Sequence, residues 1–75
     1  MRDNNINRHQ AANRYTTELR LRFRDLRREN GLSQAKLGEL IGVDQATISN
    51  FESGRTVMSV KQAYEMALIF DVELA

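Results

Sequence analysis

The sequence predicts one small all-α domain with four helices, at about residues 17–30, 34–41, 45–53 and 60–70. Apolar residues recur every three to four positions in these segments, which is the period of an amphipathic helix. Residue types that cap helix starts precede the segments, and glycine follows the second and the third. A chain of 75 residues forms a single core and buries only about 60% of its unfolded surface.

Residues 1–15, MRDNNINRHQAANRY, are predicted to form a flexible N-terminal arm before a folded domain over residues 16–75. The segment is rich in Asn, Arg and Gln and nearly lacks large apolar residues, so it cannot bury enough surface to order itself. The only histidine, His9, lies here without a neighbouring metal ligand.

The first helix is predicted to begin at Thr17, a residue type that caps helices, and to end near Asn30. Its apolar residues Leu19, Phe23 and Leu26 fall at positions i, i+4 and i+7, which places them on one side of the helix. We expect this side to face the core.

The second and third helices are predicted to meet at a short turn. Ser33 and Asp44 stand where these helices would start, and Gly42 stands where the second would end in a left-handed conformation. Gly38 lies inside the second helix, where glycine costs about 0.5–1 kcal/mol relative to alanine. We therefore expect a close neighbour there, namely the third helix. The apolar residues of this pair are Leu37, Leu40, Ile41, Val43, Ile48 and Phe51.

The last helix is predicted to start after Ser59. Its inner side would carry Val60, Ala63, Met66, Ala67 and Phe70. Three further apolar residues lie off that side, namely Leu68, Ile69 and Val72. Three exposed apolar residues close together predict a contact with another surface.

The composition excludes several classes of protein. There is no cysteine, hence no disulfide and no thiolate metal site. No apolar run reaches the roughly 18 residues that span a bilayer, so we expect a cytoplasmic protein without membrane contact. The sequence has no Gly-rich phosphate loop and no nucleophile with a matching base, so neither an enzyme nor a bound cofactor is expected.

Charge is divided unevenly along the chain. Residues 1–30 carry eight arginines against four acidic residues, whereas residues 31–75 carry three basic against six acidic residues. The basic half could steer the protein toward an anionic partner. A solvated, arginine-rich helix explains the same pattern equally well.

The outer side of the third helix is unusual for a solvated surface. Successive residues of a helix are rotated by 100°. If Ile48 and Phe51 face inward, the residues that face outward are Ala46, Ser49, Asn50 and Ser53, and Gln45 is free at the start of the helix. This side is polar, small and uncharged. Amides pair with adenine edges in the major groove, Ser contacts several bases, and the Ala46 methyl can touch a thymine methyl. We expect base contacts from Gln45 first, then Ala46, Ser49 and Asn50.

Over residues 19–72 the chain resembles the phage repressor and Cro (XRE) family of helix-turn-helix proteins. The matching stretches are LRRENGLSQ at 26–34, QAKLGELIGVDQATISNFESG at 34–54 and FESGR at 51–55. The POU-specific domain is a weaker resemblance, because it has a longer connection between the two central helices. Family members usually add a fifth helix, which this sequence lacks or truncates.

The resemblance implies roles for further residues. Arg27 would form a partly buried ion pair with Glu52. Gln34 would contact a DNA phosphate and brace Gln45, and Arg55 would contact another phosphate. Thr47 and Lys36 are weaker candidates for phosphate contacts. Apart from the resemblance, Arg2, Arg8 and Arg14 of the N-terminal arm could enter a minor groove, as arms of some DNA-binding domains do, although a plain tail is the favoured interpretation.

These observations predict a transcriptional regulator, a repressor, that binds double-stranded DNA as a homodimer on a two-fold site. Two alternatives remain open. The domain could be an antitoxin-type module whose main partner is a protein, such as a toxin or another regulator. It could also be the DNA-binding fragment of a larger regulator.

Overall fold

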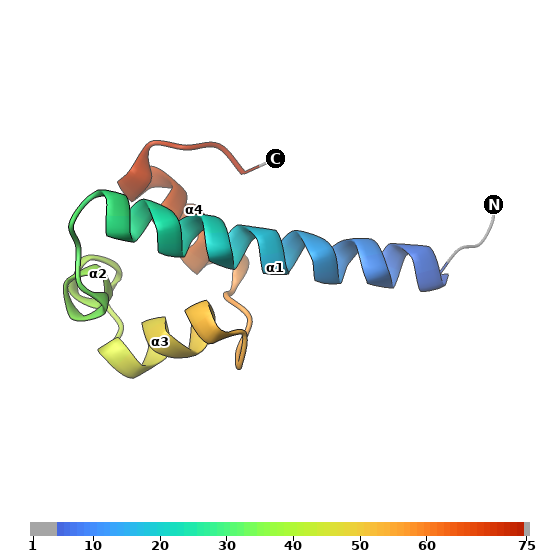
Figure 1. The fold of residues 1–75 in the computed structure, drawn as a ribbon, viewed down its shortest axis with the longest axis horizontal. Coiled ribbons are helices and arrows are strands. Elements are labelled where there is room, and N and C mark those ends of the chain that lie inside the picture. Colours follow the sequence, from blue (N-terminus) through green and yellow to red (C-terminus); the bar gives the residue numbers. More distant parts are fainter. Residues whose placement is uncertain (1–4, 75) are drawn as a thin grey trace.

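The computed structural model describes residues 5–74 and contains four helices in that range: α1 (Asn5–Glu29), α2 (Gln34–Ile41), α3 (Gln45–Ser53) and α4 (Val60–Phe70). The predicted all-α class is confirmed. The C-terminal half of α1 packs with the three short helices, whereas its N-terminal half projects beyond them (Figure 1). None of the helices in this range is long and apolar enough to cross a membrane.

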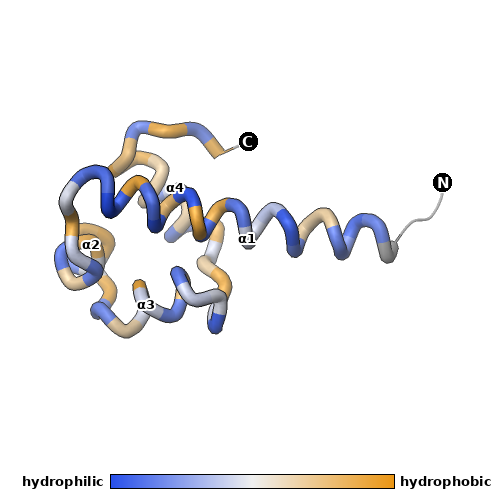
Figure 2. The backbone as a smooth tube through the Cα atoms, viewed as in Figure 1, coloured by the Kyte–Doolittle hydropathy of each residue, from blue (hydrophilic) through white to orange (hydrophobic). Residues whose placement is uncertain are grey.

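The start of the first helix differs from the prediction. Helix α1 begins at Asn5, so Thr17 lies inside it and is not a cap, and residues 5–15 are helical rather than irregular. No glycine or proline precedes Gly31, and extending a helix that tertiary packing has already nucleated is easier than starting one. The projecting half is largely hydrophilic (Figure 2). Whether it moves as a flexible arm stays a prediction, and residues 1–4 lie outside the described range.

Each helix contributes to one core. The buried residues are Phe23, Leu37, Ile48, Phe51, Ala63, Met66 and Ala67, with Leu19, Leu26 and Phe70 packed against them. The rings of Phe23 and Phe70 stack with their centroids 6.2 Å apart. Val60 is an exception to the predicted inner side, because it is 85% exposed. As the first residue of α4, it lies where no other helix covers it.

The turn between α2 and α3 explains the glycine inside α2. A Cβ atom on Gly38 would lie 2.6 Å from the carbonyl oxygen of Val43. The close neighbour is therefore the turn together with the N-cap of α3, since the Asp44 carbonyl oxygen would lie 3.3 Å from the same atom. Gly42 ends α2 with φ at 78°, in the predicted left-handed conformation, and the Val43 N–H donates to the Gly38 carbonyl at 2.8 Å.

Helix α4 begins at a capping box, and the segment that follows it packs against the core. The Ser59 hydroxyl accepts a hydrogen bond from the Gln62 N–H, and the Gln62 side chain accepts one from the Ser59 N–H. After α4, Val72 and Leu74 pack against the core, and Ile69, which lies within α4, also packs against it. Of the three residues expected to form an outer contact, only Leu68 is exposed, at 62%. No fifth helix follows within residues 71–74.

Candidate nucleic-acid interface

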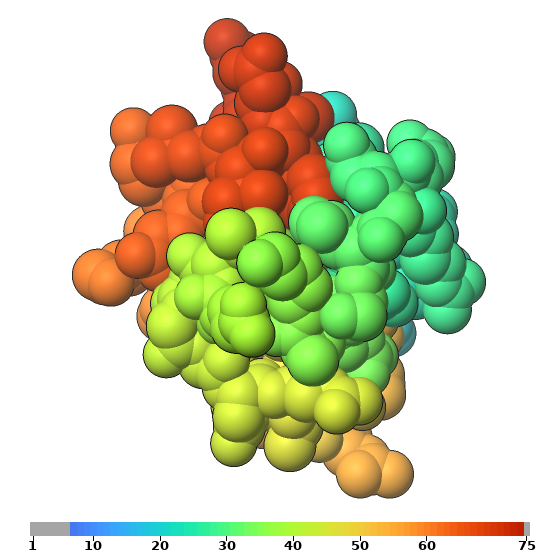
Figure 3. All heavy atoms as spheres, turned by 90° about the vertical axis from the view of Figure 1, so that its left-hand side faces the viewer, coloured from blue at the N-terminus to red at the C-terminus, as the bar shows by residue number. Residues whose placement is uncertain are grey.

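The outer side of α3 is open to solvent. Gln45 and Ala46 are exposed, while Ser49 and Asn50 are half-buried. On the opposite side Ile48 and Phe51 are buried. In Figure 3 the yellow atoms of α3 lie at the lower side of the molecule, beside orange atoms of the segment that follows it, and no other helix covers them from below. Since a helix with its side chains is about 10–12 Å wide and the major groove of B-DNA about 12 Å, α3 can enter the groove.

A cap positions the start of α3. One Asp44 carboxylate oxygen accepts hydrogen bonds from the Thr47 N–H at 2.9 Å and from the Thr47 hydroxyl at 2.7 Å. The hydroxyl bond, followed by the backbone bond, lowers the pKa of Asp44. Thr47 thus donates its only hydroxyl proton within the protein. A donated bond from Thr47 to a phosphate would require this cap to open.

The C-terminal part of α3 is joined to α1 by an ion pair between Arg27 and Glu52. The Arg27 Nε donates to Glu52 Oε2 at 2.6 Å, and Nη2 donates to Oε1 at 3.0 Å. Both side chains are only 10% exposed. A third bond, from Arg27 Nη1 to the Leu32 carbonyl at 2.8 Å, fixes the loop before α2. A buried pair with two parallel bonds of this kind holds its elements in one orientation.

Gln34 connects this ion pair to the start of α3. Its Nε2 donates to Glu52 Oε1 at 3.0 Å, and its Oε1 accepts from Gln45 Nε2 at 3.4 Å. The four side chains form one chain of contacts from Arg27 to Gln45. Each amide NH2 group carries a second hydrogen, so both glutamines retain a donor for DNA. The Gln34–Gln45 contact expected from the resemblance is present, and the bond to Glu52 is an addition.

Glu52 stays ionised in this setting. Burial by itself raises the pKa of its carboxyl group, but hydrogen bonds from Arg27 and Gln34 and the nearby charges of Arg27 and Arg28 outweigh burial. The net effect is a pKa below the ordinary value of a glutamate. The negative charge is therefore maintained at neutral pH, and with it the ion pair.

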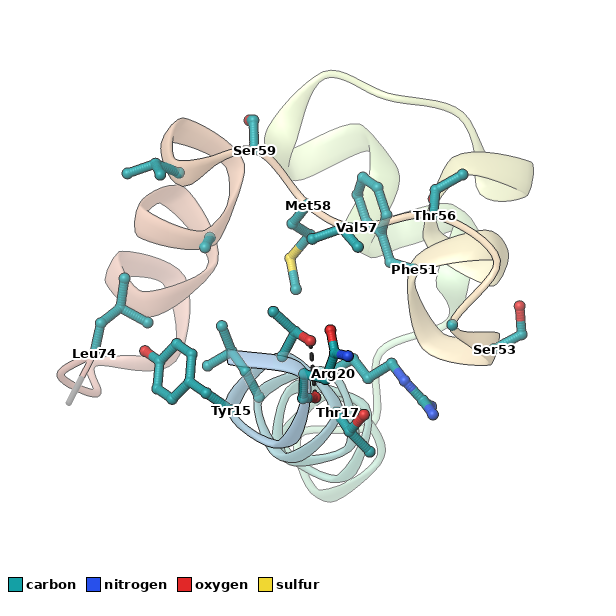
Figure 4. Close-up of a pocket in the computed structure, with 16 residues that line it drawn as sticks. Tyr15, Thr17, Arg20, Phe51, Ser53, Thr56, Val57, Met58, Ser59 and Leu74 are labelled. Carbon is teal, nitrogen blue, oxygen red and sulfur yellow. Dashed lines mark hydrogen bonds between the residues drawn. The ribbon is translucent and has the colours of Figure 1, made fainter. Parts of the chain in front are cut away.

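Arg20 was not among the predicted site residues. Its Nη1 donates to the backbone carbonyl of Glu52 at 2.8 Å, and in Figure 4 it extends toward the end of α3. A cation at a helix C-terminus interacts favourably with the helix dipole. Arg20 lies seven residues before Arg27, so both project from the same side of α1. That spacing was the available signal in the sequence.

The remaining predicted contact residues lie around α3. Lys36, in the first turn of α2, is exposed, with its Nζ 3.4 Å from Glu39 Oε1. Arg55 follows the C-terminal cap of α3 and is also exposed. Both cations are accessible to a phosphate. Arg8 and Arg14 lie on the projecting half of α1, outside the helix-turn-helix unit, and Arg2 lies outside the described residues.

Two short helices, α2 and α3, are joined by a three-residue turn. The second of them is fixed by contacts with α1 and α2, and its outer side is exposed to solvent. This arrangement defines a helix-turn-helix DNA-binding domain. Residues 23–75 match the helix-turn-helix family. The chain belongs to this family, in its Cro/C1-type (XRE) branch. Within residues 5–74 no group of three or more His, Cys, Asp or Glu side chains could hold a metal ion.

Three archaeal proteins show similarity to the chain. A protein of Archaeoglobus fulgidus, named as an HTH-type transcriptional regulator, is 32% identical over 56 residues, which cover 75% of this chain and 80% of that protein. Proteins of Thermococcus kodakarensis and Pyrococcus furiosus, named as HTH-type transcriptional regulatory proteins, are 36% and 34% identical over 53 residues. The match spans 71% of this chain but only 17% of each of these two relatives. No solved structure gives a significant match.

Proposed function

We propose that the protein regulates transcription by binding a specific duplex sequence through α3 in the major groove, and that it acts as a repressor by occupying its operator. The observation that carries this proposal is the exposed, uncharged polar side of α3, held by the contacts from Gln45 through Gln34 and Glu52 to Arg27. A solvated surface needs no such bracing, whereas reading base edges requires a fixed geometry.

Gln45 and Ala46 lie in the first turn of α3, the part of a recognition helix that reaches the bases. The Gln45 amide suits an adenine, and the Ala46 methyl suits a thymine methyl. Ser49 and Asn50 follow one turn later and would contact neighbouring bases. Each amide that pairs with a base through two bonds contributes about 1–3 kcal/mol of discrimination.

The phosphate contacts in this proposal come from Gln34, Arg55 and Lys36. Gln34 opens α2, so the free N–H groups of that helix start can add to the contact. We assign Thr47 to the cap of α3 in preference to a phosphate contact, because its hydroxyl already donates to Asp44. Such contacts set orientation and salt dependence but carry no sequence information.

The active form in this proposal is a homodimer on a two-fold DNA site, and its chemistry is binding without catalysis and without a cofactor. We include a cytoplasmic location in this proposal, because a prokaryotic cell keeps its DNA in the cytoplasm. In two of the relatives the match covers only 17% of the protein's length. This supports the alternative that such a domain is one part of a larger regulator. An antitoxin-type role with a protein partner is the second alternative.

A selection from a random duplex library tests the proposed function. The protein is incubated with the library at low and at physiological salt, and bound duplexes are sequenced. We expect an enriched motif that persists at the higher salt, with half-sites about one helical turn apart. Binding that loses all sequence preference at both salt concentrations would contradict base reading by α3.

A further inference from the structure

A hollow opens between α1, the end of α3 and the start of α4 (Figure 4). Its volume is about 690 Å³. Short side chains leave this space unfilled, namely Thr16 on α1 and Ala63 on α4, and Gly54 after α3 has no side chain. Pockets that bind small molecules usually measure about 300–1,000 Å³. The hollow is therefore large enough for a small organic molecule.

Much of the lining of the hollow is apolar. Phe51 and Met58 contribute to it, and Figure 4 shows the Met58 side chain pointing into the hollow, with Tyr15 and Leu74 at one edge. Burying such surface against a hydrocarbon is favourable, and the thioether of a methionine adapts to ligands of irregular shape. This part of the hollow suits an apolar chain or ring.

The charge at the hollow selects the other part of the ligand. Arg20 is the one charged side chain among the described residues that line it, and in Figure 4 it lies at the edge next to the end of α3. Its Nη1 donates to the Glu52 carbonyl, but a guanidinium carries five N–H donors. It can therefore bind a ligand oxygen as well. The planar guanidinium matches the geometry of a carboxylate.

Arg20 also connects the hollow to the end of α3. A Cβ atom on Gly54, the C-cap of α3, would lie 3.0 Å from Arg20 Nε, so the guanidinium lies directly against this cap. A carboxylate can bind a guanidinium through two parallel bonds, whereas the Glu52 carbonyl accepts one bond from Arg20. A carboxylate bound in the hollow thus competes with the end of α3 for Arg20. It also brings a negative charge close to Arg55, the proposed phosphate contact. Both effects weaken binding to DNA.

We propose that the hollow binds a small amphipathic carboxylate, an apolar chain or ring with one carboxylate group, and that this ligand is an effector that weakens DNA binding. The apolar body lies against Phe51 and Met58, and the carboxylate pairs with Arg20. The binding site does not depend on DNA, whereas the effector role rests on the proposed function.

A titration of the intact chain without DNA tests the site. The probes are decanoate, below its micelle-forming concentration, and naphthylacetate, and their neutral counterparts are decanol and naphthylacetamide. Nuclear magnetic resonance spectra of the backbone amides locate the binding. We expect saturable shifts at Thr16, Gly54 and Met58 with at least one of the two carboxylates. Its neutral counterpart should bind about tenfold more weakly, because it cannot form the charged bond to Arg20. No saturable shift with either carboxylate, or equal affinity for the neutral counterpart, would overturn the proposal.

Two variants assign the binding to the hollow. Arg20→Gln removes the cation, and Met58→Trp fills the space with a larger side chain. The matched controls are Arg22→Gln, at an exposed position on the same helix, and Leu40→Trp, on α2 at a position 50% exposed. All four should keep their helical circular dichroism. We expect only the first two to lose carboxylate binding, and unchanged binding in either of them would contradict the site.

Binding to the selected DNA sequence tests the effector role. The dissociation constant for the duplex is measured with and without saturating carboxylate, so that each variant serves as its own reference. For wild type we expect the carboxylate to weaken DNA binding by about fivefold or more, within the usual range of coupled sites. DNA must weaken carboxylate binding by the same factor. The carboxylate should not change DNA binding by Arg20→Gln and Met58→Trp. Unchanged DNA affinity of wild type would overturn the effector role.

The two experiments separate this inference from the proposed function. Carboxylate binding in the hollow, together with a library selection that yields no motif, supports the site and contradicts the proposed function. Sequence-specific DNA binding by a protein that binds neither carboxylate contradicts this inference and leaves the proposed function in place.

Discussion

The guanidinium of Arg27 and the carboxylate of Glu52 are joined by two hydrogen bonds of 2.6 and 3.0 Å, across 25 residues of sequence. Because Glu52 also accepts a bond from Gln34, which contacts Gln45, this pair connects the stability of the domain to the end of α3 that we propose reads bases. The same carboxylate thus serves both the fold and the orientation of the first residue of α3.

Removing one partner of the pair should be costly. We expect Arg27→Met to lower the free energy of unfolding by about 3–5 kcal/mol, because the buried Glu52 carboxylate loses its counter-charge. The double variant Arg27→Met with Glu52→Leu should recover part of this loss, since no charge is then left unpaired. Urea unfolding monitored by circular dichroism measures both. A loss below about 1 kcal/mol in the single variant would place the pair in the class of weak surface ion pairs.

Stability should depend on pH through Glu52. Its pKa is lower in the folded protein than the ordinary value, so the unfolded state binds a proton first as the pH falls. The stabilisation by Glu52 is therefore fully present at neutral pH and is lost below the ordinary glutamate pKa, about 4.3. Urea unfolding of wild type and Glu52→Gln from pH 7 to pH 3 measures this. Wild type should be the more stable at pH 7, with the difference shrinking toward pH 3. A difference that stays constant would show that ionisation of Glu52 contributes nothing.

Arg20 should stabilise the end of α3. Arg20→Gln removes a charged donor from the Glu52 carbonyl, and bonds of this kind contribute about 1.5–3 kcal/mol. We expect Arg20→Gln to lower the free energy of unfolding by an amount toward the lower end of this range, because Arg20 is only half-buried. Arg22→Gln is the matched control, since Arg22 lies on the same helix and is exposed. Chemical unfolding compares the two, and equal stabilities would remove Arg20 from this role.

Much of the fold could be predicted from local sequence, because local rules govern it. The caps at Ser33 and Asp44 and the left-handed Gly42 depend on residues within four positions, and the structure shows each of them as expected. The start of α1 could not be predicted in this way. Composition suggested disorder before Thr17, but the packed half of α1 continues without interruption through a segment that has no helix breaker.

The sequence-based prediction of the site was wrong or incomplete where segments distant in the sequence meet. The second bond of Gln34, to Glu52, requires the start of α2 to lie beside the end of α3, which no spacing within either helix reveals. The period of α4 likewise placed Val60 on the inner side of the helix, although it is 85% exposed in the structure. Residue types therefore indicated the candidate base-reading side, and the family resemblance indicated the Arg27–Glu52 pair and the Gln34–Gln45 contact. The bond that links the two, from Gln34 to Glu52, became visible only in three dimensions.

Arg55 should contribute to affinity without contributing to sequence preference. Arg55→Ala should weaken binding to the selected site and to random duplex by similar factors. It should also reduce the salt dependence by about one phosphate contact, since each contact releases about one counterion. Titrations at several salt concentrations measure both effects. An unchanged salt slope with unchanged affinity would exclude Arg55 from the interface.

The most direct test of base reading by α3 is to repeat the library selection with Gln45→Ala and to compare its motif with that of wild type. The account predicts that the variant remains folded and keeps most of the motif, but loses preference at one base pair in each half-site, at a cost of about 1–3 kcal/mol for the wild-type sequence. An unchanged motif, or an equal loss of affinity for specific and random DNA, would contradict base reading by Gln45.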